Sequence, residues 1–146
     1  MILGIGIDSV EIARFERWKS FTHEQLGRIF SPDEIAYCFA QPNKTAERFA
    51  VRFAVREALY KALSAAAPEQ KVPFLTLCTK LRVDSGKRAP KLLIEGDYFR
   101  KLGIPELRQV HLSLTHTATT ATALVVLEAT STCCSCKTST KRRRID

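Results

Sequence analysis

Two carboxylates and a set of cations are the residues best suited to chemistry in this sequence. Asp8 follows the glycine-rich segment GIGI, and Glu57 lies four residues before Lys61 in the segment RFAVREALYKAL. Two carboxylates with open coordination positions suit Mg²⁺, which binds a few carboxylates together with substrate phosphates. Neighbouring lysines and arginines would hold those phosphates. These residue types indicate a metal-dependent enzyme that acts on a phosphorylated ligand.

A long helix, from about Thr45 to Leu63 and ended by Ala67-Pro68, must position most of these groups. At 100° per residue its arginines fall within one sector of about 80°, and Phe49, Phe53 and Tyr60 form an adjacent core sector. Glu57 and Lys61 lie on another side, where their neighbours are small, so an open groove is expected there. The arginines are Arg48, Arg52 and Arg56, and the small residues are Ala50, Ala54 and Ala58.

Each of these features also has a purely structural explanation. Glu57 and Lys61 have the favourable order of an exposed i,i+4 ion pair. Asp8 could be the N-cap of a following helix, with Glu11 completing a capping box. The arginines could form a solvated helix face, and His116 could be a surface residue in a hairpin turn.

The N-terminal segment is predicted as a strand that leads to Asp8. Leu3, Ile5 and Ile7 alternate with glycine, so one face is apolar and the other has no side chains until Asp8. A helix is expected from Ser9, where the apolar spacing changes to a helical period.

The remaining elements predict an α+β domain. Ser31 and Pro32 are typical of a helix start, so a short helix is expected from Ser31 to Phe39. A final antiparallel hairpin is expected, with the glycine strand joining or flanking its sheet. Other expected elements are a hairpin of 78–83 with 91–94, a short helix over 97–102, and the strands 110–115 and 121–127 of the final hairpin.

Charge and composition divide the chain into one domain, residues 1–129, and a basic tail, residues 130–146, which is predicted to be disordered. Of the formal charge of +8, the tail contributes four charges. The remaining excess fits a polyanionic ligand as well as a nucleic acid. Three of the five cysteines lie in the tail, so no disulfide framework is indicated and a reducing, cytoplasmic setting is expected. The apolar run of residues 1–7 is too short for a signal peptide.

The sequence contains three blocks in a specific order and at a specific spacing. They are GIGIDSVEIARF (4–15), RFAVREALYKAL (52–63), and VHLSLTHT followed by ALVVLE (110–117 and 123–128). In these blocks the chain resembles holo-acyl-carrier-protein synthase, the small type of 4′-phosphopantetheinyl transferase. The resemblance covers Met1 to about Glu128. It implies a 4′-phosphopantetheinyl transferase-like α+β fold, with helices packed on a small antiparallel sheet.

The resemblance also implies the reaction. The 4′-phosphopantetheine arm of coenzyme A is transferred to a serine of apo acyl carrier protein, with release of adenosine 3′,5′-bisphosphate, in fatty acid biosynthesis. Implied with it are Mg²⁺ as cofactor, a cytoplasmic enzyme, and a homotrimer with active sites at subunit interfaces. Membrane and nucleic-acid partners are not expected.

Site residues carry over position by position. Asp8 and Glu57 match the metal ligands, and Lys61 matches a lysine that approaches the pyrophosphate, so these three are the catalytic candidates. Arg14 matches the basic first helix that meets the acidic carrier protein. Coenzyme A binding is assigned to Lys44, Arg52, Lys61, His116 and Thr117, with His116 serving the site of a neighbouring protomer.

Two positions depart from the family pattern. Arg56 stands where lysine is usual, which keeps the charge but changes the donor geometry. The segment Ser64-Ala-Ala-Ala-Pro68 stands where a Gly-Thr-Gly type loop is expected, so phosphate contacts that need glycine backbone stay open.

Two other functions fit part of the sequence. A Mg²⁺-dependent hydrolase of a phosphorylated nucleotide ligand would use the same two carboxylates, and the product would distinguish it from a transferase. A basic nucleic-acid-binding protein would account for the isoelectric point of about 9.5 and the KRRR segment. That second function gives no reason for Asp8 and Glu57.

Overall fold

The structure is a computed structural model that describes residues 1–86, 89–104 and 107–130. Apart from Thr130, the predicted tail lies outside the described residues. In chain order the elements are β1 (Ile2–Glu11), η1 (Ile12–Ser20), α1 (His23–Gly27), α2 (Pro32–Phe39), η2 (Pro42–Lys44), α3 (Thr45–Ala66), α4 (Phe74–Thr79), β2 (Leu81–Asp84), β3 (Lys91–Ile94), α5 (Tyr98–Lys101), β4 (Leu107–His116) and β5 (Thr120–Ala129).

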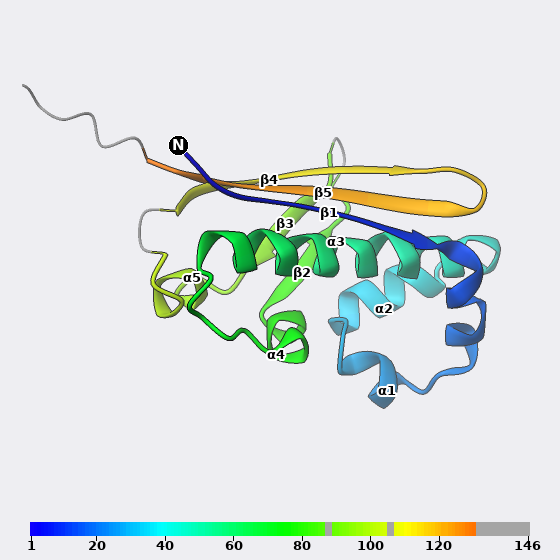
Figure 1. The fold of residues 1–146 in the computed structure, drawn as a ribbon. Helices are drawn as coiled ribbons and strands as arrows, with labels where there is room; N and C mark the ends of the chain where they lie inside the picture. The colour runs from blue at the N-terminus through cyan, green and yellow to red at the C-terminus, as the bar shows by residue number, and fades with distance from the viewer. Residues whose placement is uncertain (87–88, 105–106, 131–146) are drawn as a thin grey trace, which may run out of the picture.

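A three-stranded antiparallel sheet in the order β1-β5-β4 covers one side of the long helix α3, and α1, α2 and α4 lie on its other side (Figure 1). β2 and β3 form a separate antiparallel pair. The α+β fold is therefore confirmed, as are the C-terminal hairpin and the place of the glycine strand in its sheet.

β1 and α3 are in close contact because the facing positions of β1 are glycines. A Cβ atom at Gly6 would lie 1.9 Å from the carbonyl oxygen of Ala58, and one at Gly4 would lie 2.1 Å from that of Ala62. Ala54 and Ala58 are completely buried. The expected open groove along the alanines is therefore wrong, because the glycine side of β1 fills it.

The apolar side of β1 points away from α3. Ile5 and Ile7 are 57% and 59% exposed, and Ile2 and Leu124 are also exposed large apolar residues. In register, Ile7 lies opposite Leu124 of β5. The outer face of the sheet thus presents apolar side chains, which we call the outer sheet face.

The expected change from strand to helix at Asp8 is wrong. β1 continues to Glu11, which pairs with Thr120, because β5 is long enough to hydrogen-bond the whole strand. Asp8 pairs with Ala123 inside the sheet, so it is not a helix N-cap. The following segment is a 3-10 helix, Ile12–Ser20, and its N-cap residue Glu11 makes no side-chain capping bond.

Local signals placed several other elements correctly. Ser31 accepts a hydrogen bond from the Glu34 backbone and Glu34 accepts one from Ser31, the reciprocal capping box of α2. The long helix is confirmed over 45–66. The expected strand 78–83 begins late, because Cys78 belongs to α4 and β2 starts at Leu81. The short helix expected over 97–102 is α5, whereas α1 was not anticipated.

The core lies between α3, the sheet and an aromatic cluster. Phe49 and Phe15 are buried, and Trp18 packs on Phe15 with ring centroids 4.7 Å apart. Within the described residues, no helix has both the length and the apolar character that a bilayer crossing requires.

Candidate active site

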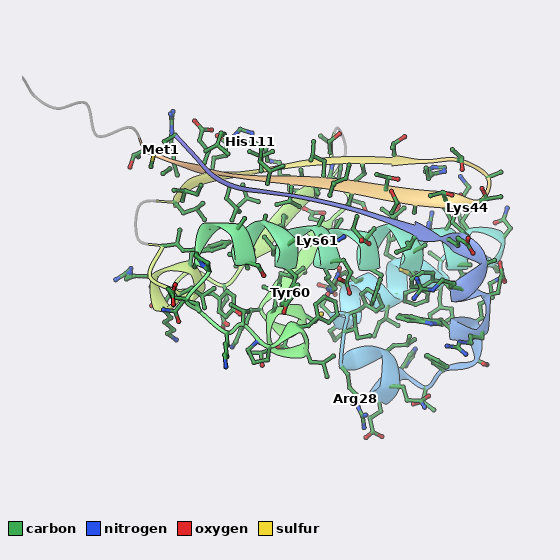
Figure 2. All side chains as sticks on the ribbon, viewed as in Figure 1. Met1, Arg28, Lys44, Tyr60, Lys61 and His111 are labelled. Atoms are coloured by element: carbon green, nitrogen blue, oxygen red, sulfur yellow. The ribbon has the colours of Figure 1, made fainter. Side chains whose placement is uncertain are left out.

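Asp8 and Lys61 meet where β1 crosses α3. The Lys61 ammonium donates hydrogen bonds to Asp8 Oδ1 at 2.8 Å and to the Ile7 carbonyl oxygen at 3.1 Å. The side chain of Asp8 is 13% exposed and that of Lys61 is 51% exposed. Figure 2 shows Lys61 beside β1, in the C-terminal part of α3. The ion pair of Lys61 is thus with Asp8 on another element rather than with Glu57 on its own helix.

Glu57 lies close enough to Asp8 and Lys61 to interact electrostatically with both. Burial raises the pKa of Glu57, and the negative charge of Asp8 raises it further, while Lys61 and Arg14 act in the opposite direction. The net shift is upward, so ionised Glu57 lacks sufficient compensating charge. A cation bound between the two carboxylates would supply that compensation.

Asp8 Oδ2 is a second sign of a missing partner. This oxygen is buried and makes no hydrogen bond within the described residues. A buried carboxylate oxygen without a partner is costly, so native structures usually satisfy it with a donor, a water or an ion. Two carboxylates, one with an unpartnered oxygen, fit Mg²⁺, which completes its shell with water and substrate phosphates. Among the described residues no group of three or more His, Cys, Asp or Glu side chains offers a full protein cage.

The cationic candidates form a second group near the start of α3. A hollow of about 250 Å³, which we call the cationic hollow, is lined by Lys44, Arg48, Arg52 and His116, together with one carboxylate, Glu47. Its uncharged walls come from α2, β4 and the segment around the β2–β3 turn, and include Tyr37, Val83, Ser85, Pro90, Leu114 and Thr115.

Arg52 is held rigidly in this hollow. Arg52 is only 4% exposed. Its guanidinium donates hydrogen bonds to Ser85 Oγ and to the Arg48 carbonyl oxygen, and lies 4.2 Å from the centre of the Tyr37 ring. Its Nε is buried without a hydrogen-bond partner. An oriented guanidinium with a spare donor is suited to an anionic ligand.

His116 and Thr117 lie at the end of β4 and in the turn that follows. His116 Nε2 is 3.5 Å from Glu47 Oε1, and the His116 side chain is 48% exposed. Thr117 Oγ1 accepts hydrogen bonds from the backbone of Thr119 and Thr120. Thr117 therefore closes the β4–β5 turn, whereas His116 faces the cationic hollow.

The two groups do not face the same side of α3. Five residues separate Arg52 from Glu57, a rotation of about 140° around the helix. Figure 2 shows Lys44 near the start of α3 and Lys61 in its C-terminal part. The structure thus brings Asp8, Glu57 and Lys61 together, and separately brings together Lys44, Arg52 and His116.

Some residues of these sites had not been expected. Tyr37 and Ser85 contact Arg52, but nothing in their local sequence marks them, because the contact is made between α2, α3 and the end of β2. The arginine sector of α3 was a usable signal for Arg48. Arg56 belongs to neither site: it is completely buried and paired with Glu34, so a solvated arginine face is wrong.

The alanine segment that replaces the expected glycine loop is part of α3. The helix runs to Ala66, and the Ala67 N–H donates to the Leu63 carbonyl oxygen at 2.9 Å. Backbone N–H groups of this segment are therefore used within the helix. The segment therefore does not form the open backbone loop that the family pattern has at this position.

Residues 4–125 match the family model of the 4′-phosphopantetheinyl transferase superfamily. A holo-[acyl-carrier-protein] synthase from Anaeromyxobacter sp. (strain K) is 43% identical over 128 residues, which cover 81% of this chain and 89% of that protein.

Two solved structures share the fold. The holo-[acyl-carrier-protein] synthase from Neisseria meningitidis has a TM-score of 0.70 at 27% identity, covering 88% of this chain and 99% of that chain. The Bacillus anthracis enzyme, solved in complex with coenzyme A, has a TM-score of 0.66 at 29% identity. The match covers 89% of this chain and 99% of that chain. With its family model, its relatives and its α+β architecture in agreement, the chain belongs to the holo-[acyl-carrier-protein] synthase family of 4′-phosphopantetheinyl transferases.

Proposed function

We propose that the protein performs its family's reaction at the junction of β1 and α3, with Asp8 and Glu57 as the ligands of Mg²⁺. As a holo-[acyl-carrier-protein] synthase, it transfers the phosphopantetheine group of coenzyme A to apo acyl carrier protein in fatty acid biosynthesis. The observation that carries the assignment of the site is the buried, unpartnered Asp8 Oδ2 beside the half-buried Glu57.

The carboxylates and Lys61 would divide the work at this site. Bound Mg²⁺ would polarise the pyrophosphate of coenzyme A and neutralise its developing charge. Asp8 and Glu57 would hold the ion, and the close contact of β1 with α3 fixes the position of Asp8. Lys61 is half exposed, so its ammonium can turn from Asp8 towards an entering phosphate. The attacking serine belongs to the carrier protein.

Coenzyme A would be held at its nucleotide end by the cationic hollow. Lys44, Arg52 and His116 line it, and the spare donor of Arg52 suits a phosphate oxygen. The Bacillus anthracis relative was solved with coenzyme A, which supports this ligand class.

A homotrimer with shared active sites is the assembly that this arrangement favours. The carboxylates and the cationic hollow lie on different sides of α3, so one coenzyme A molecule would use the carboxylates of one protomer and the hollow of its neighbour. The outer sheet face, with Ile5 and Ile7 exposed, offers an apolar surface for such contacts. A monomeric mass in light scattering would contradict this assembly.

A cytoplasmic location suits the two described cysteines. Burial raises the pKa of Cys38 to about 12 and that of Cys78 to about 11, so both thiols stay protonated. Both are free and buried, as expected for structural cysteines in a reducing compartment.

Mass spectrometry of apo acyl carrier protein tests the reaction directly. Incubation with this protein, coenzyme A and Mg²⁺ should add one phosphopantetheine group to the carrier. A carrier of unchanged mass, under conditions in which a control transferase works, would refute the proposal. Hydrolysed coenzyme A beside an unmodified carrier would instead favour the hydrolase alternative.

Arg14→Glu is expected to weaken the binding of acyl carrier protein far more than the binding of coenzyme A. Arg14 lies on η1 beside a hollow of about 490 Å³ that is also lined by Arg17, Trp18 and Phe53, a basic and aromatic surface close to Glu57. Carrier proteins are acidic, so reversing a charge at the rim should raise the KM for the carrier by about tenfold. This rise in KM should be larger at lower salt concentration.

Steady-state kinetics with each substrate varied in turn measures this effect. Arg28→Glu, the same charge change at the exposed end of α1 (Figure 2), is the matched control. An Arg14→Glu enzyme with a raised KM for coenzyme A and an unchanged KM for the carrier would place Arg14 at the nucleotide instead.

A further inference from the structure

Arg56 and Glu34 form an ion pair that is enclosed by the core. Arg56 is 0% exposed and Glu34 is 3% exposed. The pair is bidentate, with Nη2 2.8 Å from Oε2 and Nη1 3.1 Å from Oε1. Burial raises the pKa of Glu34, but the charge and hydrogen bonds of Arg56, together with two backbone N–H groups, bring it below its ordinary value. Glu34 is therefore ionised at neutral pH and faces the Arg56 guanidinium.

All five N–H donors of Arg56 are used. Two bind Glu34, and the other three reach carbonyl oxygens on three different segments. Those acceptors are Ile29 at 2.8 Å, Arg52 at 3.2 Å and Leu81 at 3.4 Å. Glu34 in turn accepts from the backbone N–H of Ser31 at 2.9 Å and of Val83 at 3.0 Å. The pair thus connects the start of α2, the middle of α3 and strand β2.

The hydrogen bonds to β2 hold one wall of the cationic hollow. Leu81 and Val83, on the same face of β2, bind Arg56 and Glu34 respectively. Two residues beyond Val83, the Ser85 hydroxyl accepts a hydrogen bond from Arg52. Val83, Ser85 and Pro90 all line the hollow. The position of this wall relative to Arg52 therefore depends on the buried pair.

A purely stabilising role would not need charged residues. Well-packed apolar side chains of similar size often replace a buried ion pair without loss of stability, because both charges are costly to remove from water. What apolar residues cannot do is bind specific backbone groups of a neighbouring strand. The bonds to Leu81 and Val83 are of that kind.

We infer that Arg56 and Glu34 are positioning residues for coenzyme A: they fix the β2–β3 hairpin against α3 so that Ser85 and Arg52 form the binding wall of the cationic hollow. The inference rests on the proposed use of that hollow for the nucleotide end of coenzyme A. Neither residue is among those that line the cationic hollow, and neither contacts Asp8, Glu57 or Lys61 among the described interactions.

The test is the double variant Glu34→Met with Arg56→Met, which removes both charges together. The KM for coenzyme A and the Kd of adenosine 3′,5′-bisphosphate should rise by at least about tenfold, the effect of losing one charge-assisted hydrogen bond. The kcat and the KM for the carrier protein should stay within about twofold, because β1 and Glu57 are not tied to the hairpin. Faster hydrogen exchange at the Val83 amide would show that the hairpin has loosened.

Two further variants separate positioning from stability. Arg56→Lys keeps a cation beside Glu34, and with it the Glu34 bond to Val83, so it should restore most of the affinity for adenosine 3′,5′-bisphosphate. Arg82→Ala breaks an exposed ion pair with Asp33 that also joins β2 to α2, and it should leave that affinity unchanged. If the double variant does not fold, Ser85→Ala is the alternative test. It removes the hydrogen bond between the hairpin and Arg52 and should weaken the binding of adenosine 3′,5′-bisphosphate.

The outcomes are distinguishable. Wild-type protein that modifies the carrier but has no affinity for adenosine 3′,5′-bisphosphate would refute the use of the hollow. Wild-type protein that binds it, with a folded double variant or Ser85→Ala of equal affinity, would overturn the inference and leave the proposed function in place. A parallel loss of kcat and of affinity for both substrates would also overturn it, because that is the pattern of general destabilisation.

Discussion

Asp8→Ala and Glu57→Ala are each expected to lower the rate of phosphopantetheine transfer by at least about a hundredfold while the protein stays folded. Both carboxylates are proposed to act through a bound cation, and neither belongs to the apolar core. Asp8→Asn and Glu57→Gln, which keep the size of each side chain, should be as inactive. Initial rates at millimolar Mg²⁺, with circular dichroism as the check on folding, measure the effect. Near-normal turnover by either alanine variant would show that the ligand assignment is wrong.

Thermal unfolding gives a readout of the same site that does not depend on activity. A ligand that binds the folded state raises the melting temperature, so Mg²⁺ or Mn²⁺ should stabilise the wild-type protein and not Asp8→Asn. Without metal, Glu57→Gln should melt above wild type at pH 7. Burial and the charge of Asp8 raise the pKa of Glu57, so ionised Glu57 costs stability above that pKa, and the cost disappears as the pH falls or when glutamine replaces it.

Sequence reasoning was most successful where a local signal decides the structure. The Ser31 cap with Pro32 marked the start of α2, and the helical period of the 45–66 segment marked α3. The alternation of residues 110–115 and the apolar run of residues 121–127 were enough to predict the hairpin of β4 and β5. In each case the residues that give the signal are the residues that form the element.

The same reasoning failed where a partner that is distant in the sequence decides the structure. Asp8 looked like a boundary because the apolar period changes after it, but pairing with β5 extends the strand to Glu11. The alanines of α3 looked like an open groove because their partner, the glycine side of β1, lies some 50 residues away in sequence. Arg56 looked like part of an arginine face, and its burial depends on Glu34, on another helix.

The candidate site was predictable only in part for a related reason. Asp8, Glu57 and Lys61 were predicted because two carboxylates and a cation lie in sequence blocks that resemble a known family, although each residue alone also had a structural explanation. Tyr37 and Ser85 gave no such signal, since an aromatic residue and a serine are unremarkable in any local context. Their contacts with Arg52 exist only after α2 and β2 pack against α3.

Gly6→Ala is expected to destabilise the fold by more than about 3 kcal/mol, beyond the usual range for one extra methyl group in a core. A Cβ at Gly6 would lie 1.9 Å from the carbonyl oxygen of Ala58 and 2.7 Å from the backbone N of Ala62. These are backbone atoms of α3, so no side-chain rotation can relieve the clash, and β1 would have to leave the helix.

Gly27→Ala is the matched control, because a Cβ at Gly27 meets nothing within 4 Å. Gly27 is the last residue of α1, where alanine should be neutral or stabilise the protein by about 0.5–1 kcal/mol. Urea unfolding of both variants and wild type gives the comparison. A Gly6→Ala protein within about 1 kcal/mol of wild type would mean that β1 and α3 are not in the contact that the structure shows.

The position of Gly6 makes this a test of the site as well as of the fold. Asp8 lies two residues along β1 on the same side of the strand, so any shift that accommodates a methyl group at Gly6 also moves Asp8 relative to Glu57 on α3. Gly6→Ala molecules that remain folded, for instance at low temperature, should therefore lose the stabilisation by Mg²⁺ along with transfer activity. Gly27→Ala should keep both, because α1 lies on the other side of α3 from the sheet (Figure 1). Loss of metal response without loss of stability would place the effect at the carboxylates, and loss of stability with a retained metal response would separate the packing of β1 from the position of Asp8.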